Sequence, residues 1–290
     1  MFKKRKSPSL IGFYLLLTYV LLQFTWWGYL MLKLNKKWFM VIGEGSVFLV
    51  LLLVGVVRIR RTFRKETQLA RQQSNFLLSV THELKSPIAS ARLQLETLLL
   101  RDIEREKQKS ILRNAIGDTD RLNALVENIL LAAQIDKSNF VLHRKEEDLS
   151  EYLLDLLSRP GTAPDHRLIF TIEPGLRFKI DNTHFASIIL NLLDNACKYS
   201  AKGSQISVEL KKAGPAFLLS VTDEGYGISD ENKKQVFEKF YRVGKEETRT
   251  TKGTGLGLYI VKHLVEEHGG GIKVLDNKPK GTIFKIEFRS

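Results

Sequence analysis

Two long apolar stretches open the chain, and a short basic turn separates them. Residues 10–32 carry no charged side chain, and at about 1.5 Å per helical residue they are long enough for a hydrocarbon core of roughly 30 Å. Residues 38–57 form the second stretch, with lysines before it and arginines after it. The pattern predicts transmembrane helices at 10–32 and 38–57, an N-terminal segment at 1–9 and an external turn at 33–37. A cleaved signal peptide is the alternative for the first stretch, although the run is long for one and no small-residue cleavage motif follows it.

The charges around these stretches predict their orientation. Four Lys or Arg precede the first stretch and five closely follow the second, against three in the turn. The positive-inside rule then puts both ends of the membrane hairpin in the cytoplasm. Because the turn is too short to fold as an external domain, we expect a signal to be sensed within the bilayer, at its face or through a membrane-protein partner.

Beyond a juxtamembrane linker at 58–68, apolar residues recur at intervals of three, four or seven, which is typical of amphipathic helices. The first such helix carries Leu69, Phe76, Val80, Leu84, Ile88, Ala91, Leu95 and Leu98. After a charged turn at 101–109, the second carries Leu112, Ala115, Thr119, Leu122, Val126, Ile129 and Ala133. The pattern predicts an all-α helical hairpin over 69–137 whose apolar face is too large for one pair of helices to cover. We therefore expect a homodimer built on a four-helix bundle.

A histidine and a proline lie in the first of these helices, within the stretch SVTHELKSPIAS. His82 follows Val80 by two residues, which places it about 200° round the helix from the apolar stripe and predicts an outward-pointing side chain. Pro87 has no N–H for the carbonyl of Glu83, and its ring clashes with that turn. We therefore expect a bend one turn after His82, where a reactive side chain would need to be held in place.

From about residue 145 the pattern changes to short apolar runs, helices and glycine-rich loops. Strands are predicted at 167–172, 206–210, 217–221 and 281–288. This mixture indicates a separate C-terminal α/β domain over 145–290.

Polar groups suited to a nucleotide occur at three places in this domain. Asn191, Asn195 and Lys198 share one helical face. Amide oxygens suit a Mg²⁺ ion that keeps phosphate and water ligands, and a lysine suits phosphate. Asp223 ends a strand, so its carboxylate can accept from an amino group such as that of adenine, while the following Gly225 and Gly227 let a ligand approach the backbone. A polar helical face and an ordinary tight turn are the alternatives for these two features.

The third place is a run of alternate glycines, Gly253, Gly255 and Gly257, which leads into an amphipathic helix. Free N–H groups and the helix dipole can meet phosphates there. The run is neither the dinucleotide-binding G-x-G-x-x-G of a βαβ unit nor a Walker A loop.

Composition changes this picture in two ways. The net charge of +13 would favour nucleic-acid binding, but residues 1–65 contain twelve Lys or Arg and one acid and so account for 11 of the 13 charges. We therefore expect no nucleic-acid partner. The single cysteine, Cys197, cannot form an internal disulfide, and the six histidines show no zinc-ligand spacing, so we expect no structural metal.

Taken together, the order and spacing of these motifs resemble those of the membrane-bound sensor histidine kinases of two-component signalling. The resemblance covers nearly everything from about residue 65 onward. It implies a HisKA-type dimerisation and phosphotransfer domain followed by an α/β sandwich similar to the ATP-binding domain of DNA gyrase. The matching stretches are HELKSP for the H box, NLLDNACKYS for the N box, DEGYGIS for the G1 box, FEKFYR for the F box and GTGLGL for the G2 box.

The resemblance implies a protein-histidine kinase that uses ATP and Mg²⁺ to phosphorylate His82 and passes the phosphoryl group to an aspartate of a cognate response regulator. In that mechanism Glu83 accepts the ring proton, Asn195 holds Mg²⁺ with help from Asn191, and Asp223 reads adenine. The remaining implied nucleotide contacts are Lys198, Tyr199, Gly225, Gly227, Arg242 (toward the γ-phosphate), Gly253, Gly255, Leu256 and Gly257. The implied location is the bacterial cytoplasmic membrane, with the kinase domains in the cytoplasm.

The chain departs from the family in one residue, Ser86, and in the length of one linker. Two alternative functions also stay open. Ser86 stands where the family often has Thr or Asn to place water for regulator dephosphorylation. It keeps a hydroxyl, but it leaves the strength of a phosphatase activity open. One alternative is a protein that works mainly as a regulator phosphatase, which the sequence does little to separate from a kinase. About ten residues separate the second apolar stretch from the histidine helix, which leaves no room for the common HAMP relay. The other alternative is a nucleotide-binding membrane scaffold without phosphotransfer. Phosphorylation in cis or in trans is equally open, and the loop 243–252 is expected to be ordered by nucleotide.

Overall fold

The computed structural model of the chain describes residues 8–33, 38–136, 140–159, 161–163, 165–243 and 253–289. The chain divides into two compact units, Met1–Ala70 and Arg71–Ser290, which are treated separately below. Most of the predicted N-terminal segment, of the external turn and of the loop between the F and G2 boxes lies outside the described residues.

The first unit contains helix α1 (Pro8–Lys33) and the beginning of helix α2 (Trp38–Leu100). The rings of Phe24 and Phe48 are stacked, with centroids 4.4 Å apart. A Cβ atom added to Gly45 would lie 3.4 Å from the Phe24 ring. The two helices therefore pack against each other, with a glycine allowing the close approach.

Two expectations about this region change with the structure. The segment predicted as a linker at 58–68 is helical, because α2 runs without a break to Leu100. Over the described residues, none of the helices combines the length and the apolar character that a membrane crossing requires. The two spans predicted at 10–32 and 38–57 are therefore not confirmed.

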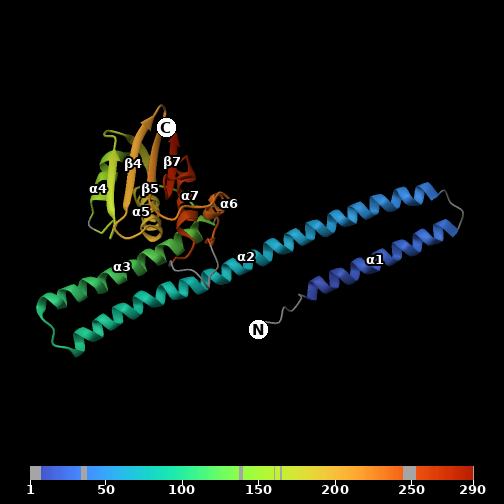
Figure 1. Ribbon diagram of the computed structural model, residues 1–290, viewed down its shortest axis with the longest axis horizontal. Helices are drawn as coiled ribbons and strands as arrows, with labels where there is room; N and C mark the ends of the chain where they lie inside the picture. The colour runs from blue at the N-terminus through green and yellow to red at the C-terminus, as the bar shows by residue number, and fades with distance from the viewer. Residues whose placement is uncertain are drawn as a thin grey trace. The chain divides into compact units, whose positions relative to one another are not determined.

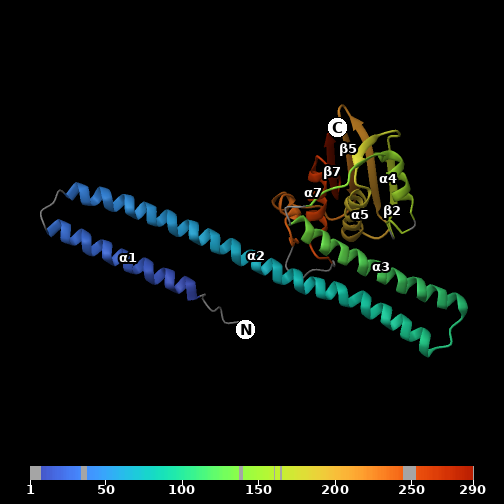
Figure 2. The same cartoon turned by 180° about the vertical axis from the view of Figure 1, so that it is seen from behind.

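The second unit begins with the helical hairpin, formed by the remainder of α2 and by α3 (Arg105–Ile135) (Figures 1 and 2). The amide of Gln94 on α2 donates to the Asp118 carboxylate on α3 over 3.2 Å. Part of the charged stretch predicted as a turn at 101–109 is the first turn of α3, because Arg, Glu and Lys are good helix formers. Pro87 is buried, and the helix continues through it.

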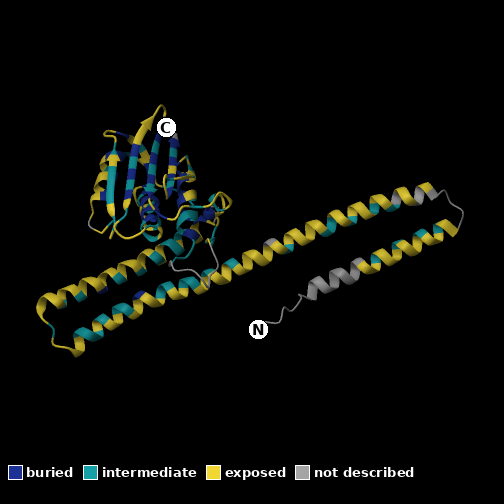
Figure 3. Ribbon diagram, viewed as in Figure 1, coloured by how far each residue is buried: buried dark blue, intermediate teal, exposed yellow. Residues whose placement is uncertain are grey.

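Much of the hairpin is exposed within the single chain (Figure 3). Large apolar side chains, some in the predicted stripe and some beside it, are among the exposed residues. The exposed fraction is 54% for Ile88 and 48% for Leu95 on α2, and 60% for Ile116 and 51% for Leu130 on α3. Side chains at these spacings would be expected to lie in a core, so the surface they form has no cover within one copy of the chain.

The rest of the second unit is the predicted α/β domain. Its five-stranded sheet has the order β2-β4-β5-β7-β6, with β2 parallel to β4 and the other neighbours antiparallel. The strands of the main sheet are β2 (Arg167–Ile172), β4 (Gln205–Ala213), β5 (Ala216–Asp223), β6 (Gly270–Asp276) and β7 (Thr282–Arg289). The four predicted strands are present among them. A small antiparallel sheet of β1 (Lys145–Asp148) and β3 (Arg177–Ile180) was not predicted.

One face of the main sheet is covered by helices, as Figures 1 and 2 show. These helices are α4 (Leu149–Ser158), α5 (Asn182–Tyr199) and α7 (Gly257–Glu267). Alternate residues of β4 are buried under them, among them Ile206 and Leu210, whereas Glu209 between these two is only partly covered. This period of two is the expected signature of a sheet with one packed face. A short helix α6 (Asp230–Lys233) and a 3₁₀ turn η1 (Gln235–Phe237) precede the last part of the F box.

A buried histidine near the end of α7 predicts a pH-dependent stability. His268 is 1% exposed; its Nε2 accepts from the backbone N–H of Asp181 over 3.2 Å, and its Nδ1 lies 2.6 Å from the carbonyl oxygen of Leu264. Burial lowers the pKa of His268 below its ordinary 6.5, so below that pH the unfolded chain binds a proton that the folded chain does not. Stability is therefore lost as the pH falls from about 6.5 toward the lowered pKa, by at most about 1.4 kcal/mol per pH unit.

The measurement is the midpoint of urea unfolding between pH 7.5 and 5. We expect the wild type to lose stability more steeply than His268→Gln over this range, and the exposed His143→Gln to follow the wild type. Parallel curves for the wild type and His268→Gln would contradict the assignment.

Candidate nucleotide and phospho-acceptor site

Close approaches between backbone segments bring the N box together with the G1 and G2 boxes. A Cβ atom on Gly225 would lie 2.6 Å from the carbonyl oxygen of Tyr199, at the end of α5. A Cβ atom on Gly257, at the start of α7, would lie 2.8 Å from Oδ1 of Asn191. A side chain does not fit against the backbone at Gly225, so packing requires glycine there. At Gly257 the close atom is the end of the Asn191 side chain, which would have to move to admit a Cβ atom.

Asp223 is held at the end of β5 by backbone groups from two different segments. Its Oδ1 accepts from the N–H of Gly225 over 2.8 Å and from the N–H of Thr282 over 3.2 Å, and the side chain of Thr282 also hydrogen-bonds the carboxyl. Burial of this side chain, which is 4% exposed, raises the pKa of Asp223 above its usual range, and these hydrogen bonds oppose the rise. The result is a fixed carboxyl group at the C-terminal end of β5, the central strand of the sheet, between two glycine-containing loops.

Gly281 makes the approach to Asp223 possible from the other side. Its φ is +125°, and a Cβ atom there would lie 1.9 Å from the Asp223 carbonyl oxygen. The side chain of Asn277 donates to that same oxygen over 2.9 Å. The loop between β6 and β7 therefore supports the G1 turn directly.

The three polar residues of the N box lie on α5 as predicted, but in different environments. Asn191 is 8% exposed, and its Nδ2 donates to the carbonyl oxygen and the hydroxyl of Ser187 over 2.8 and 3.2 Å. Asn195 is half-buried. Lys198 forms an ion pair with Asp194 one turn earlier, with 2.5 Å between Nζ and Oδ2. Asn195 is therefore the more accessible of the two amides, and the ammonium of Lys198 is already paired with Asp194 in the structure.

The G2 run forms a loop that ends in the buried Leu256, and α7 begins at Gly257. Gly255 has a φ of +73°, and a Cβ atom on it would lie 2.8 Å from the carbonyl oxygen of Tyr241 and 3.1 Å from Cγ of Arg242. This places the G2 loop against the F box. Gly227 and Gly253 also have positive φ values, of 76° and 156°, in the G1 and G2 loops.

The predicted phospho-acceptor lies on the surface of the hairpin. His82 and Ser86 are exposed, one turn apart on α2. Glu83 faces α3 instead, where its carboxylate lies 3.7 Å from the guanidinium of Arg121. The outward position predicted for His82 is therefore confirmed by its exposure.

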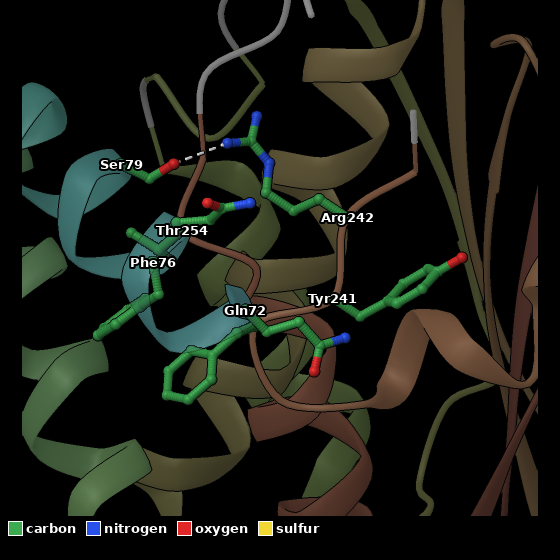
Figure 4. Close-up of a pocket in the computed structure, with 8 residues that line it drawn as sticks. Gln72, Phe76, Ser79, Tyr241, Arg242 and Thr254 are labelled. Carbon is green, nitrogen blue, oxygen red and sulfur yellow. Dashed lines mark hydrogen bonds between the residues drawn. The ribbon is translucent and has the colours of Figure 1, made fainter. Parts of the chain in front are cut away.

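Arg242 connects the F box to the histidine helix. Its Nη1 donates to the hydroxyl of Ser79 over 3.0 Å, and Ser79 precedes His82 by three residues, which is about one helical turn. The ring of Phe76 packs against that of Phe240 with centroids 4.3 Å apart. Figure 4 shows Arg242 extended toward Ser79 in a pocket that Gln72, Asn75, Phe76, Ser79, Phe240, Tyr241, Arg242 and Thr254 line.

The end of α3 is anchored to the same domain by a group of polar contacts. The hydroxyl of Tyr259 donates to Asp136 over 2.9 Å, and the ammonium of Lys239 pairs with the same carboxylate. The hydrogen bond from Lys239 lowers the pKa of Asp136, while burial and the hydrogen bond to Asp136 raise the pKa of Tyr259 to about 12. Ala132 and Ile135 of α3 are buried in the core of the α/β domain. The hairpin and the domain thus share a packed boundary.

Several of these residues were not predicted from the sequence. They are Ser79, Arg121, Asp136, Lys239, Tyr259, Asn277, Gly281 and Thr282. Gly281 and Thr282 lie at the start of the strand predicted at 281–288, but that prediction does not indicate a contact with Asp223. The others lie on faces or loops whose partners are distant in the sequence.

Two protein-family models match the chain. The model described as the His Kinase A (phospho-acceptor) domain matches residues 72–138. The model described as the histidine kinase-, DNA gyrase B-, and HSP90-like ATPase matches residues 180–290. The two matched regions contain the hairpin with His82 and most of the α/β domain with its glycine loops.

Curated relatives match over a longer region. The sensor protein KdpD of Clostridium acetobutylicum is 33% identical over 225 residues, which are 76% of this chain and 25% of KdpD. The sensor protein SrrB of Staphylococcus aureus is 30% identical over 237 residues, which are 80% of this chain and 41% of SrrB. The chain therefore spans less than half the length of these relatives.

Among solved structures, full-length ShkA in complex with AMPPNP is similar to this chain. The alignment covers 73% of this chain and 44% of the ShkA chain. The TM-score is 0.51 and the sequence identity 21%. At that identity the likeness concerns the fold alone.

Proposed function

Because the chain belongs to the sensor histidine kinases of two-component signalling, we propose that it phosphorylates His82 from ATP and passes the phosphoryl group to an aspartate of a cognate response regulator. The observation that carries this proposal is the exposed His82 on the matched phospho-acceptor hairpin. It lies in the same compact unit as a buried carboxylate set between glycine loops.

In the proposed reaction one ring nitrogen of neutral His82 attacks the γ-phosphorus of ATP. The P–N bond forms as the P–O bond to ADP breaks, and the proton on the other ring nitrogen passes to Glu83. Cations around the transferring group stabilise its charge, and Arg242, which already reaches α2 at Ser79, is the candidate for the γ-phosphate. Asp223 accepts from the adenine amino group.

The residues present fit a Mg²⁺ ion that arrives with the nucleotide. The half-buried amide of Asn195 offers a neutral oxygen on the same helical face as Lys198. Such a donor suits an ion that keeps phosphate and water ligands, and Asn191 is the assisting residue. When bound, Mg²⁺ supplies charge neutralisation at the phosphates, while Asn195 fixes its position relative to α5.

We propose that the exposed apolar stripe of the hairpin is covered by a second copy of the chain. Ile88 and Leu95 of the predicted stripe, and Ile116 and Leu130 beside the stripe on α3, are each about half exposed or more. Burial of such apolar surface is the usual driving force for a four-helix bundle. Sedimentation that shows a monomer at micromolar concentration would contradict the homodimer.

We also propose that residues 10–32 and 38–57 cross the bacterial cytoplasmic membrane, with the kinase domains on the cytoplasmic side. The support is the uncharged sequence of 10–32 and the exposure of large apolar side chains, such as Trp26 and Leu51 at 66% each. A lipid environment would cover these side chains, and a membrane-protein partner would be a source of signal. Release of the full chain from membranes by alkaline carbonate would contradict this proposal.

The function is tested by incubating the full-length chain with Mg²⁺ and γ-labelled ATP. We expect an acid-labile, alkali-stable label that moves to a receiver domain when the cognate regulator is added. Asn195→Ala should lose the label because the metal position is lost, whereas Asn114→Ala, at an exposed asparagine of α3, should keep it. Bound nucleotide without any label in the wild type would favour the scaffold alternative.

A further inference from the structure

An ion pair between α2 and α3 holds Glu83, the residue that follows His82 in the sequence. Glu83 on α2 and Arg121 on α3 approach to 3.7 Å between Oε2 and Nη2. The Glu83 side chain is 12% exposed, whereas that of Arg121 is 57% exposed. The carboxylate is thus mostly covered, and its cationic partner lies at the surface.

Adjacent positions on α2 give His82 and Glu83 different surroundings. One residue is about 100° of helical rotation, so the imidazole is exposed while the carboxylate turns toward α3. A distance of 3.7 Å is longer than a normal hydrogen bond. The pair is therefore an electrostatic contact that orients Glu83 and still leaves its oxygens able to accept a proton.

We propose that Arg121 is a positioning residue for phosphorylation of His82, acting through Glu83. This inference rests on the function proposed above. As the P–N bond forms and ADP leaves, the proton on the second ring nitrogen of His82 goes to the Glu83 carboxylate and then to solvent. Arg121 keeps that carboxylate on the α3 side of α2, next to His82, so that it does not rotate freely into water.

The position of Arg121 separates this role from nucleotide binding and from folding. Arg121 lies on α3, outside the residues 180–290 matched by the ATPase family model. Loss of its charge should therefore change the rate of the chemical step and leave the affinity for ATP unchanged. The pair is long, at 3.7 Å, and its arginine is 57% exposed, so we expect its contribution to folding stability to be small. The thermal unfolding midpoint of Arg121→Gln, measured beside that of the wild type, checks that the variant folds.

The test measures autophosphorylation of the full-length chain from γ-labelled ATP with Mg²⁺. For Arg121→Gln we expect kcat to fall about fivefold, which is a small part of the roughly 10²- to 10⁴-fold that a general base contributes, because Glu83 is still present but less well oriented. KM for ATP should be unchanged. Arg121→Lys should restore at least half of the wild-type kcat. Arg113→Gln, at an exposed arginine about two turns nearer the start of α3, is the matched control and should behave as the wild type.

A double-mutant cycle shows whether Arg121 acts through Glu83. In the Glu83→Gln background, where the residual rate is followed over hours, Arg121→Gln should cause no further loss. A wild-type kcat in Arg121→Gln, a change confined to KM, or a full additional loss in the Glu83→Gln background would each overturn the proposal. Failure of the proposed function is distinguishable, because the wild type itself would then carry no label and both proposals would fall together.

Discussion

Replacing His82 with glutamine is expected to reduce the acid-labile label from γ-labelled ATP to background. Glutamine keeps a polar side chain of similar size, but its amide nitrogen is not a nucleophile and forms no P–N bond with phosphorus. His82 is exposed on α2, so the substitution leaves no cavity and should not change folding. Nucleotide affinity should also be unchanged, since Asp223 and the glycine loops belong to a different part of the second unit.

The matched control for this prediction is His143→Gln, at an exposed histidine outside the hairpin. It should label as the wild type does. Label of normal intensity on His82→Gln would show that another residue accepts the phosphoryl group. Loss of label together with loss of ATP binding would show a folding defect, and the thermal unfolding curve of the variant decides between these outcomes.

The strands that the sequence predicted are those with a continuous apolar pattern. β4 and β5 alternate buried and partly covered residues along most of their length, so their apolar runs are visible without any partner. β1, with the sequence KEED, is entirely charged, and β3 has only four residues. β6 begins with two glycines, which favour a loop by composition. These strands form because neighbouring strands supply hydrogen-bond partners, and that cause is not local.

The helices show the opposite limit. The periodicity predicts the histidine helix but not its continuity with the preceding segment, because a run of arginines after an apolar stretch also fits a linker. In the structure, residues 58–68 are part of α2. Arginine, lysine and glutamate are strong helix formers, so a charged segment between two helical segments continues the helix unless glycine or proline interrupts it.

For the candidate site, motifs within one element could be predicted and contacts between elements could not. Asn195 and Lys198 share a helical face because of their spacing alone. By contrast, Thr282 and Gly281 lie almost 60 residues after Asp223, and only the pairing of β5 with β7 brings them to it. Arg242 and Ser79 are farther apart still, at 163 residues. Such contacts depend on sheet order and on the docking of the hairpin, which no local pattern contains.

The carboxylate of Asp223 gives the second large expected effect, a loss of nucleotide affinity in Asp223→Asn. The substitution keeps an Oδ1 atom that can accept from the N–H groups of Gly225 and Thr282, so the turn should stay in place. The other carboxylate oxygen becomes an NH₂ group, which donates where an acceptor for the adenine amino group is needed. A hydrogen bond to a charged group contributes about 1.5–3 kcal/mol, so Kd for ATP should rise about 10- to 100-fold.

Titration calorimetry of the full-length chain with a non-hydrolysable ATP analogue measures this effect directly. Asp155→Asn is the matched control, because Asp155 lies on α4 with a side chain that is 68% exposed and paired with Arg159. It should bind the analogue as the wild type does. Because the backbone anchors of Asp223 are preserved, the thermal midpoint of Asp223→Asn without nucleotide should change little, while the stabilisation that nucleotide gives the wild type should be largely lost. Wild-type affinity in Asp223→Asn would remove this residue from adenine recognition, and the buried carboxyl would then serve only to join the β5 turn to the start of β7.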